Sequence, residues 1–337
     1  HGLRGDKQDN MMESPDFNDP ELGIPVFSLY GEVRRPTPVM MDSFDVLLVD
    51  LQDLGCRIYT FITTLRYVLE AAAQFNKRVV VLDRPNPAGR PVEGLILRPG
   101  WESFVGAGPL PMRHGLTMGE LALWFVRTLN LDVECEVVTM EGWEPGNGPG
   151  YGWPLYERTW VNPSPNAPNL WMARCYAGTV MLEGTTLSEG RGTTRPLELF
   201  GAPDLEPGKL LGEMQQLAPH WLQGCRLREC WFEPTFHKHA GKLCAGVQIH
   251  AARAAGPRNP TRSATGNLAS YRILLLPDHG SNQRTSRGCS SGAGAPRPDN
   301  RAVEPDSGCS EVHCIPIPSE KAPFREHIHP PGTCVAR

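Results

Sequence analysis

The feature that most constrains the fold is a continuous apolar run that ends in a carboxylate, over residues 44–50. A strand that is apolar on both sides is typical of a parallel sheet whose two faces are covered. Residues 62–75 follow with apolar side chains at helical spacing, and residues 78–83 form a second apolar run that ends in a carboxylate. Strand, helix and strand in this order predict one βαβ unit.

The same alternation continues along the chain. Thr117 and Glu120 have capping-box spacing before an apolar helix over residues 121–129, and residues 133–138 resemble a strand. We therefore predict an α/β fold with a Rossmann-like, open, mostly parallel sheet. A further predicted helix over residues 205–217 and strands over 225–232 and 243–250 indicate a second, smaller α/β domain.

Three regions are expected from these patterns. Residues 1–174 would form the Rossmann-like domain, and residues 175–250 part of the smaller α/β domain. Residues 251–337 are rich in Ser, Pro, Gly and Arg, so we expect a low-complexity, disordered tail. No apolar run reaches the roughly 18 residues of a membrane-spanning helix, and the net charge of -4 gives no general attraction to nucleic acid.

Polar side chains follow the two predicted strands at the edge where parallel sheets bind ligands. Asp50 and Asp83 end these strands. The loops after them carry Gln52, Asp53, Arg57, Tyr59, Arg84 and Asn86. This mixture of carboxylates, amides and cations suits a polyhydroxylated ligand. The alternative is that Asp50 and Asp83 only cap the turns that follow them.

Two further segments carry candidate site residues. Glu189 and Arg191 lie between glycines, where the backbone can approach a ligand closely. The alternative for Glu189 is a turn residue paired with Arg191. Arg113 and His114 precede the capped helix, whose N-terminus favours an anionic group; the alternative for His114 is a structural hydrogen bond. His237 and His239 alternate without a nearby third ligand, so no metal site is predicted.

Several motifs recur together in one known family. They occupy residues 1–5 (His-Gly-Leu-Arg-Gly), 50–60, 82–87, 92–94, 113–121, 163–166 and 183–196. In these motifs the chain resembles the exo-β-N-acetylmuramidase family, formerly the domain of unknown function DUF1343. The similarity runs in order from residue 1 to about residue 250.

The resemblance implies an activity and a site. Family members remove terminal N-acetylmuramic acid from the non-reducing ends of peptidoglycan fragments, without a metal or organic cofactor, and a periplasmic or secreted location is implied. The resemblance implies that the Rossmann-like domain is the catalytic one and that the active site lies in a cleft between it and the auxiliary domain. Glu189 and Asp50 are the candidate catalytic carboxylates. The candidate substrate-binding residues are His1, Arg4, Gln52, Asp53, Arg57, Tyr59, Asp83, Arg84, Asn86, Arg113, His114, Asn166 and Arg191.

The resemblance also predicts departures at both ends. In the family, a Pro-Glu pair precedes the motif that matches residues 1–5, and its glutamate is a leading candidate for the catalytic acid. We expect the catalytic domain to be incomplete at its N-terminus, with the first strand missing and an apolar sheet edge exposed. A frameshift near residue 251 would explain the abrupt tail. The alternatives to an active enzyme are a catalytically inactive sugar-binding fragment and a nonfunctional gene fragment.

Overall fold

The computed structural model describes residues 13–90, 92–142, 153, 158–222 and 224–251, together with the backbone of 333–336. The chain divides into two compact units, His1–Leu274 with Pro331–Arg337, and Leu275–Pro330; all described residues belong to the first. It is an α/β protein, as predicted. None of the described helices combines the length and the apolar character that crossing a membrane requires.

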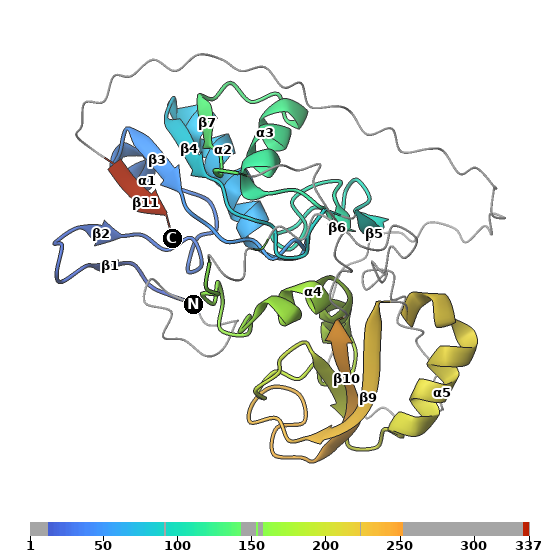
Figure 1. The fold of residues 1–337 in the computed structure, drawn as a ribbon. Helices are drawn as coiled ribbons and strands as arrows, with labels where there is room; N and C mark the ends of the chain where they lie inside the picture. Colours follow the sequence, from blue (N-terminus) through green and yellow to red (C-terminus); the bar gives the residue numbers. More distant parts are fainter. Residues whose placement is uncertain are drawn as a thin grey trace, which may run out of the picture. The chain divides into compact units, whose positions relative to one another are not determined.

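A four-stranded parallel sheet contains three strands from the first half of the described chain and one from its C-terminal end (Figure 1). Its strand order is β11 (Thr333–Ala336), β3 (Val46–Val49), β4 (Arg78–Leu82) and β7 (Cys135–Val138). All three pairings in this sheet are parallel. The expected strand–helix–strand order is confirmed here, because helix α2 (Phe61–Phe75) connects β3 to β4.

The core of this half consists of apolar side chains from the strands and from two helices, α2 and α3 (Met118–Thr128). Val79 and Val81 of β4, Leu65 of α2 and Leu121 of α3 are fully buried. Each such side chain contributes about 1.5–3 kcal/mol through removal of its surface from water. The apolar runs seen in the sequence therefore mark the layer that holds the sheet and the helices together.

The sequence predicted that a missing first strand would expose an apolar sheet edge, without saying which strand would form that edge. The backbone of β11 pairs with β3 over Val46–Val49, so that edge of β3 is occupied. The sequence assigned no element to this region, because a four-residue strand flanked by polar, Pro-rich chain has no periodicity to reveal it.

The predicted capping box at the start of α3 is confirmed. Thr117 Oγ1 accepts a hydrogen bond from Glu120 N at 3.2 Å, and a Glu120 carboxylate oxygen accepts one from Thr117 N at 2.9 Å. Arg90 donates to both carboxylate oxygens of Glu120, at 2.7 and 2.9 Å. The loop after β4 is thus attached to the N-terminus of α3, next to the expected site.

The second half contains a three-stranded antiparallel sheet. Its order is β8 (Leu199–Ala202), β10 (Cys244–Ala251) and β9 (Cys225–Phe232). Glycines allow β8 and β10 to approach, because a Cβ on Gly246 would lie 2.0 Å from Phe200 O. Helix α5 (Pro207–Leu217) contacts this sheet, as does α4 (Leu170–Thr179). The predicted helix over 205–217 and both predicted strands are confirmed.

The sequence did not predict the remaining elements. They are β1 (Phe17–Asn18), β2 (Pro25–Val26), α1 (Pro38–Asp42), β5 (Glu93–Ile96), β6 (Pro111–Arg113), α4, the 3-10 helices η1 (Val180–Gly184) and η2 (Pro219–Leu222), and β8. Most are two to five residues long, which is too short for a periodic pattern.

Candidate active site

Hydrogen bonds join three loops at the carboxyl ends of β3 and β4. Gln52 Nε2, after β3, donates to Pro85 O, after β4, at 3.0 Å. Asn86 Nδ2 donates to Leu116 O at 2.9 Å, just before α3, and Asn86 Oδ1 accepts from Ala88 N at 2.9 Å. The structure therefore brings together the loops that the strand ends predicted.

At the centre of these loops lies a buried pair, Asp53 and His114. The two side chains are 3% and 0% exposed, and Asp53 Oδ2 lies 3.1 Å from His114 Nε2. His114 Nδ1 accepts a hydrogen bond from Leu116 N at 3.1 Å, so the ring proton sits on Nε2 and is donated to Asp53. Asp53 Oδ2 also accepts from Gly55 N at 2.6 Å.

The second oxygen of Asp53 is different. Asp53 Oδ1 is buried and has no hydrogen-bond partner among the residues that the structure describes; Gln52 Oε1 shares this property. Buried polar atoms are nearly always satisfied by protein, water or ligand. Two buried acceptors on one loop are therefore left without a partner in the part of the chain that the structure describes.

Arg57 and Arg113 connect these loops to neighbouring segments through hydrogen bonds. Arg57 Nη1 donates to Leu95 O at 2.7 Å and to Leu110 O at 2.6 Å. Arg113 Nη1 donates to Glu93 Oε2 at 2.8 Å, and Arg113 Nη2 donates to the backbone carbonyl of Ala88. Both side chains are buried, as is Asn166. These contacts support the loops, and direct binding of substrate by Arg57, Asn86, Arg113 or Asn166 stays a prediction.

The two strand-ending aspartates have separate partners. Asp50 Oδ1 accepts from Arg84 Nε at 2.5 Å, and both side chains are partly exposed, at 17% and 28%. Asp83 accepts from Thr117 Oγ1 at 2.8 Å, Gly119 N at 2.8 Å and Arg84 N at 3.0 Å. Burial raises the pKa of the Asp83 carboxyl above its usual 3.8. Asp83 thus connects the end of β4 to the start of α3, and these contacts agree with the capping alternative.

Tyr59, in the loop after β3, packs against helix α4. Its ring contacts Phe61 at a centroid distance of 4.7 Å and Tyr176 of α4 edge-on at 6.2 Å. Burial raises the pKa of the Tyr59 hydroxyl and brings that of the neighbouring Cys56 thiol to about 12, so both groups are neutral near pH 7. Hence the loop joins α4 through an apolar, uncharged contact.

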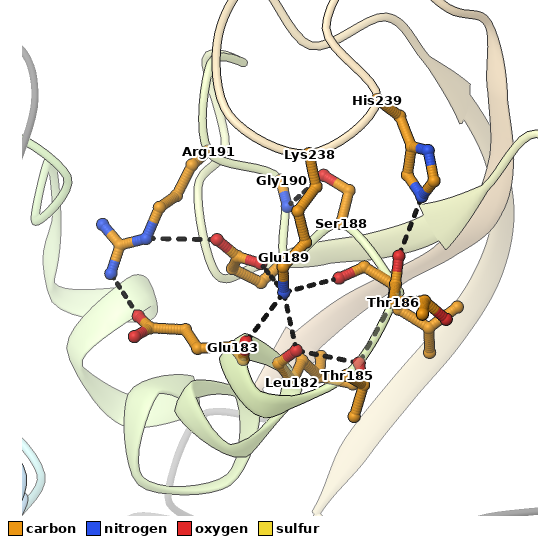
Figure 2. Close-up of polar contacts among 11 residues, drawn as sticks. Leu182, Glu183, Thr185, Thr186, Ser188, Glu189, Gly190, Arg191, Lys238 and His239 are labelled. Atoms are coloured by element: carbon orange, nitrogen blue, oxygen red, sulfur yellow. Dashed lines mark hydrogen bonds and ion pairs between the residues drawn. The ribbon is translucent and has the colours of Figure 1, made fainter. Parts of the chain in front are cut away.

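A second carboxylate centre lies in the glycine-flanked loop (Figure 2). Glu189 is 3% exposed. Its Oε1 lies 3.2 Å from Arg191 Nε, and its Oε2 accepts from Lys238 Nζ at 3.0 Å. Arg191 Nη2 also donates to Glu183. The pairing of Glu189 with Arg191 agrees with the turn-residue alternative, and it places a charged network beside β8.

Some candidates lie outside these groups. His1 and Arg4 are outside the described residues. The sequence missed Glu93, Glu183 and Lys238, which pair with predicted site residues. For Lys238 the contact with Glu189 spans 49 positions, and no local pattern reports such a pairing.

Comparisons with known proteins show which family the chain resembles. Residues 1–171 match the family model described as "Exo-beta-N-acetylmuramidase NamZ, N-terminal", and residues 174–277 match its C-terminal counterpart. The first match contains Asp53 and His114, and the second contains Glu189, Arg191 and Lys238.

Individual relatives cover most of the described chain. Peptidoglycan beta-N-acetylmuramidase NamZ of Bacillus subtilis (strain 168) is 43% identical over 254 residues, which is 74% of this chain and 59% of the relative. A crystal structure of a DUF1343 family protein from Bacteroides fragilis NCTC 9343 has a TM-score of 0.64 at 37% identity, covering 70% of this chain and 61% of that one. A second such protein from the same strain gives 0.55 at 30% identity, with 68% and 59% covered. The chain thus spans about three-fifths of the length of these relatives.

Proposed function

Because the chain belongs to the exo-beta-N-acetylmuramidase NamZ family, we propose that it is a glycoside hydrolase acting on peptidoglycan. It would release terminal N-acetylmuramic acid from the non-reducing ends of peptidoglycan fragments. The observation that carries this proposal is the 43% identity to the Bacillus subtilis relative named as a peptidoglycan beta-N-acetylmuramidase. No cofactor is included in the proposal.

The chemistry requires groups of two kinds. Hydrolysis of a glycosidic bond needs an acid for the leaving oxygen and a second group that stabilises or attacks the anomeric carbon. Asp50 stays our candidate catalytic carboxylate, because it is partly exposed and Arg84 engages only one of its oxygens. Glu189 is less suited to donating a proton, because both of its oxygens meet cations.

Substrate hydroxyls would bind on the loop after β3. Asp53 Oδ1 and Gln52 Oε1 are acceptors without described partners, and sugar hydroxyls are donors that match them. Arg84 would hold a further hydroxyl beside Asp50. The buried Asp53–His114 pair and Tyr59 would fix this loop in place.

Arg191 would recognise the group that distinguishes N-acetylmuramic acid from N-acetylglucosamine. That group is a lactyl ether with a carboxylate, and a planar guanidinium binds carboxylates through two parallel hydrogen bonds. Arg191 is 6% exposed and already oriented by Glu189. Its orientation before binding would lower the entropy cost of recognition.

We further propose a Rossmann-like catalytic domain over residues 1–174 and an auxiliary α/β domain from residue 175. The parallel order of β3, β4 and β7 supports the first part. The change from a parallel to an antiparallel sheet and the boundary between the two family matches, at residues 171 and 174, support the second.

The test is release of free N-acetylmuramic acid from a synthetic N-acetylmuramyl-N-acetylglucosamine disaccharide. We expect product from this disaccharide and none from the matched disaccharide that lacks the lactyl group. The same preparation should bind N-acetylmuramic acid in calorimetry. Binding without release would support the sugar-binding alternative, and neither binding nor release by the folded chain would contradict the proposal.

A further inference from the structure

The loop that precedes β10 packs directly on the glycine-flanked loop. Gly192 O accepts hydrogen bonds from both Thr235 N and Thr235 Oγ1, each at 2.9 Å. Gly192 has a φ of +80°, and a Cβ there would lie 2.7 Å from Phe236 N. Only glycine fits this contact, so the two loops are held at a fixed distance.

The side chain of Lys238, on this second loop, is surrounded by hydrogen-bond acceptors. Its Nζ, which has three N–H donors, lies within hydrogen-bond distance of four acceptors: Leu182 O at 2.9 Å, Leu187 O at 3.0 Å, Glu183 O at 3.1 Å and Glu189 Oε2 at 3.0 Å (Figure 2). Three of these acceptors are backbone carbonyls near η1. A compact ammonium group satisfies such a set from a single atom, which a planar guanidinium cannot do.

The backbone on either side of Lys238 is unusual. His237 and His239 have φ values of +65° and +58°, in the left-handed region that side-chain-bearing residues rarely adopt. His239 Nε2 also lies 2.8 Å from Thr186 O. Such conformations persist where the surroundings impose them, and they cluster at functional sites.

The contacts continue from Lys238 to Arg191. Lys238 holds one oxygen of Glu189, and the other oxygen holds Arg191 Nε. The exposed fractions of the side chains are 4% for Glu189 and 6% for Arg191, whereas Glu183, the second partner of Arg191, is 39% exposed. Arg191 therefore has one buried, anchored partner and one partner that borders solvent.

We propose that Lys238 is a positioning residue for substrate recognition, which acts through Glu189 to orient Arg191 toward the carboxylate of the sugar. Lys238 itself would not touch the substrate. Glu183 would give way when the lactyl carboxylate binds, so that one carboxylate replaces another on the guanidinium. This inference rests on the proposed function, since the carboxylate belongs to N-acetylmuramic acid.

The experiment compares affinities for two sugars by calorimetry, using the full chain. In Lys238→Met we expect affinity for N-acetylmuramic acid to fall about 10-fold, the size of effect that changes along a contact network produce. Affinity for N-acetylglucosamine, which lacks the carboxylate, should stay unchanged. The matched control is Lys242→Met, an exposed lysine on the same loop, which should leave both affinities as in the wild type.

A purely structural role for Lys238 would not change the ratio of the two affinities. Equal losses for both sugars, or no loss in a folded Lys238→Met variant, would overturn the inference. If that variant does not fold, Lys238→Arg decides: it keeps the charge but not the single-atom geometry, so selectivity should again decrease, and unchanged selectivity would overturn the inference. A wild-type chain that binds neither sugar would refute the proposed function, and the inference with it.

Discussion

Two of the buried carboxylates in the described part of this protein, Asp53 and Glu189, have opposite surroundings. Asp53 receives hydrogen bonds from Gly55 N and His114 Nε2 on one oxygen, while its other oxygen has no described partner. Glu189 meets Arg191 on one oxygen and Lys238 on the other. One carboxylate keeps an acceptor available, whereas the other is fully occupied.

This difference suits the two carboxylates to different roles, ligand binding for Asp53 and positioning of a neighbouring side chain for Glu189. Neutral donors orient Asp53 without cancelling its charge, so its Oδ1 can accept a strong hydrogen bond from a ligand. Two cations compensate the charge of Glu189, and removing Glu189 would take away the buried negative charge that compensates theirs. We therefore expect Asp53 to accept a hydrogen bond from a ligand, whereas Glu189 orients Arg191.

The largest expected effect comes from Asp53→Asn. The amide can keep its oxygen toward Gly55 N and His114 Nε2, so we expect the midpoint of thermal unfolding to change little. The other atom becomes a donor where an acceptor stood. Turnover of the disaccharide should fall about 100- to 1,000-fold, as when a single preorganised contact is removed from an active site.

The matched control for this variant is Asp45→Asn, at an exposed aspartate next to β3. It should keep both turnover and stability. Wild-type turnover in folded Asp53→Asn would show that the free oxygen has no part in binding, and the contrast with Glu189 would then disappear.

We expect Glu189→Gln mainly to lower the free energy of unfolding. Removing one charge from a buried network leaves cations uncompensated, which costs about 3 kcal/mol in the free energy of unfolding. Urea denaturation measures this loss, with Glu141→Gln at an exposed position as the control. A variant as stable as the wild type that still lost all turnover would restore Glu189 as a catalytic residue.

Much of the fold was predictable because its longest elements have one buried face. Helix α3 has apolar positions at helical spacing and a capping box, and strand β9 was predicted with its bounds. Helix α4 was missed because eight of its ten residues are buried, which leaves no polar face to reveal the helical period. The pairing of β11 with β3 joins residues far apart in sequence, and no local pattern encodes it.

The candidate site was predictable only in part, for a similar reason. The rule that ligands bind at strand ends brought Gln52, Asp53 and Arg84 to one edge. Which carboxylate has an oxygen without a partner among the described residues depends on tertiary neighbours, so Asp53 and Glu189 look alike in sequence. The sequence pattern gave no role to Lys238, although its ammonium group donates a hydrogen bond to Glu189.

The smallest effect is expected for Glu183→Gln, which sharpens the comparison within the Glu189 network. Glu183 also pairs with Arg191, but it is 39% exposed, so solvent screens this pair and its loss should cost less than about 1 kcal/mol. Calorimetry should show affinity for N-acetylmuramic acid equal to or higher than that of the wild type, because a competitor for Arg191 is weakened. If Glu183→Gln instead destabilised the protein as much as Glu189→Gln, both carboxylates would be anchors, and Arg191 would have no exchangeable partner to yield to a substrate.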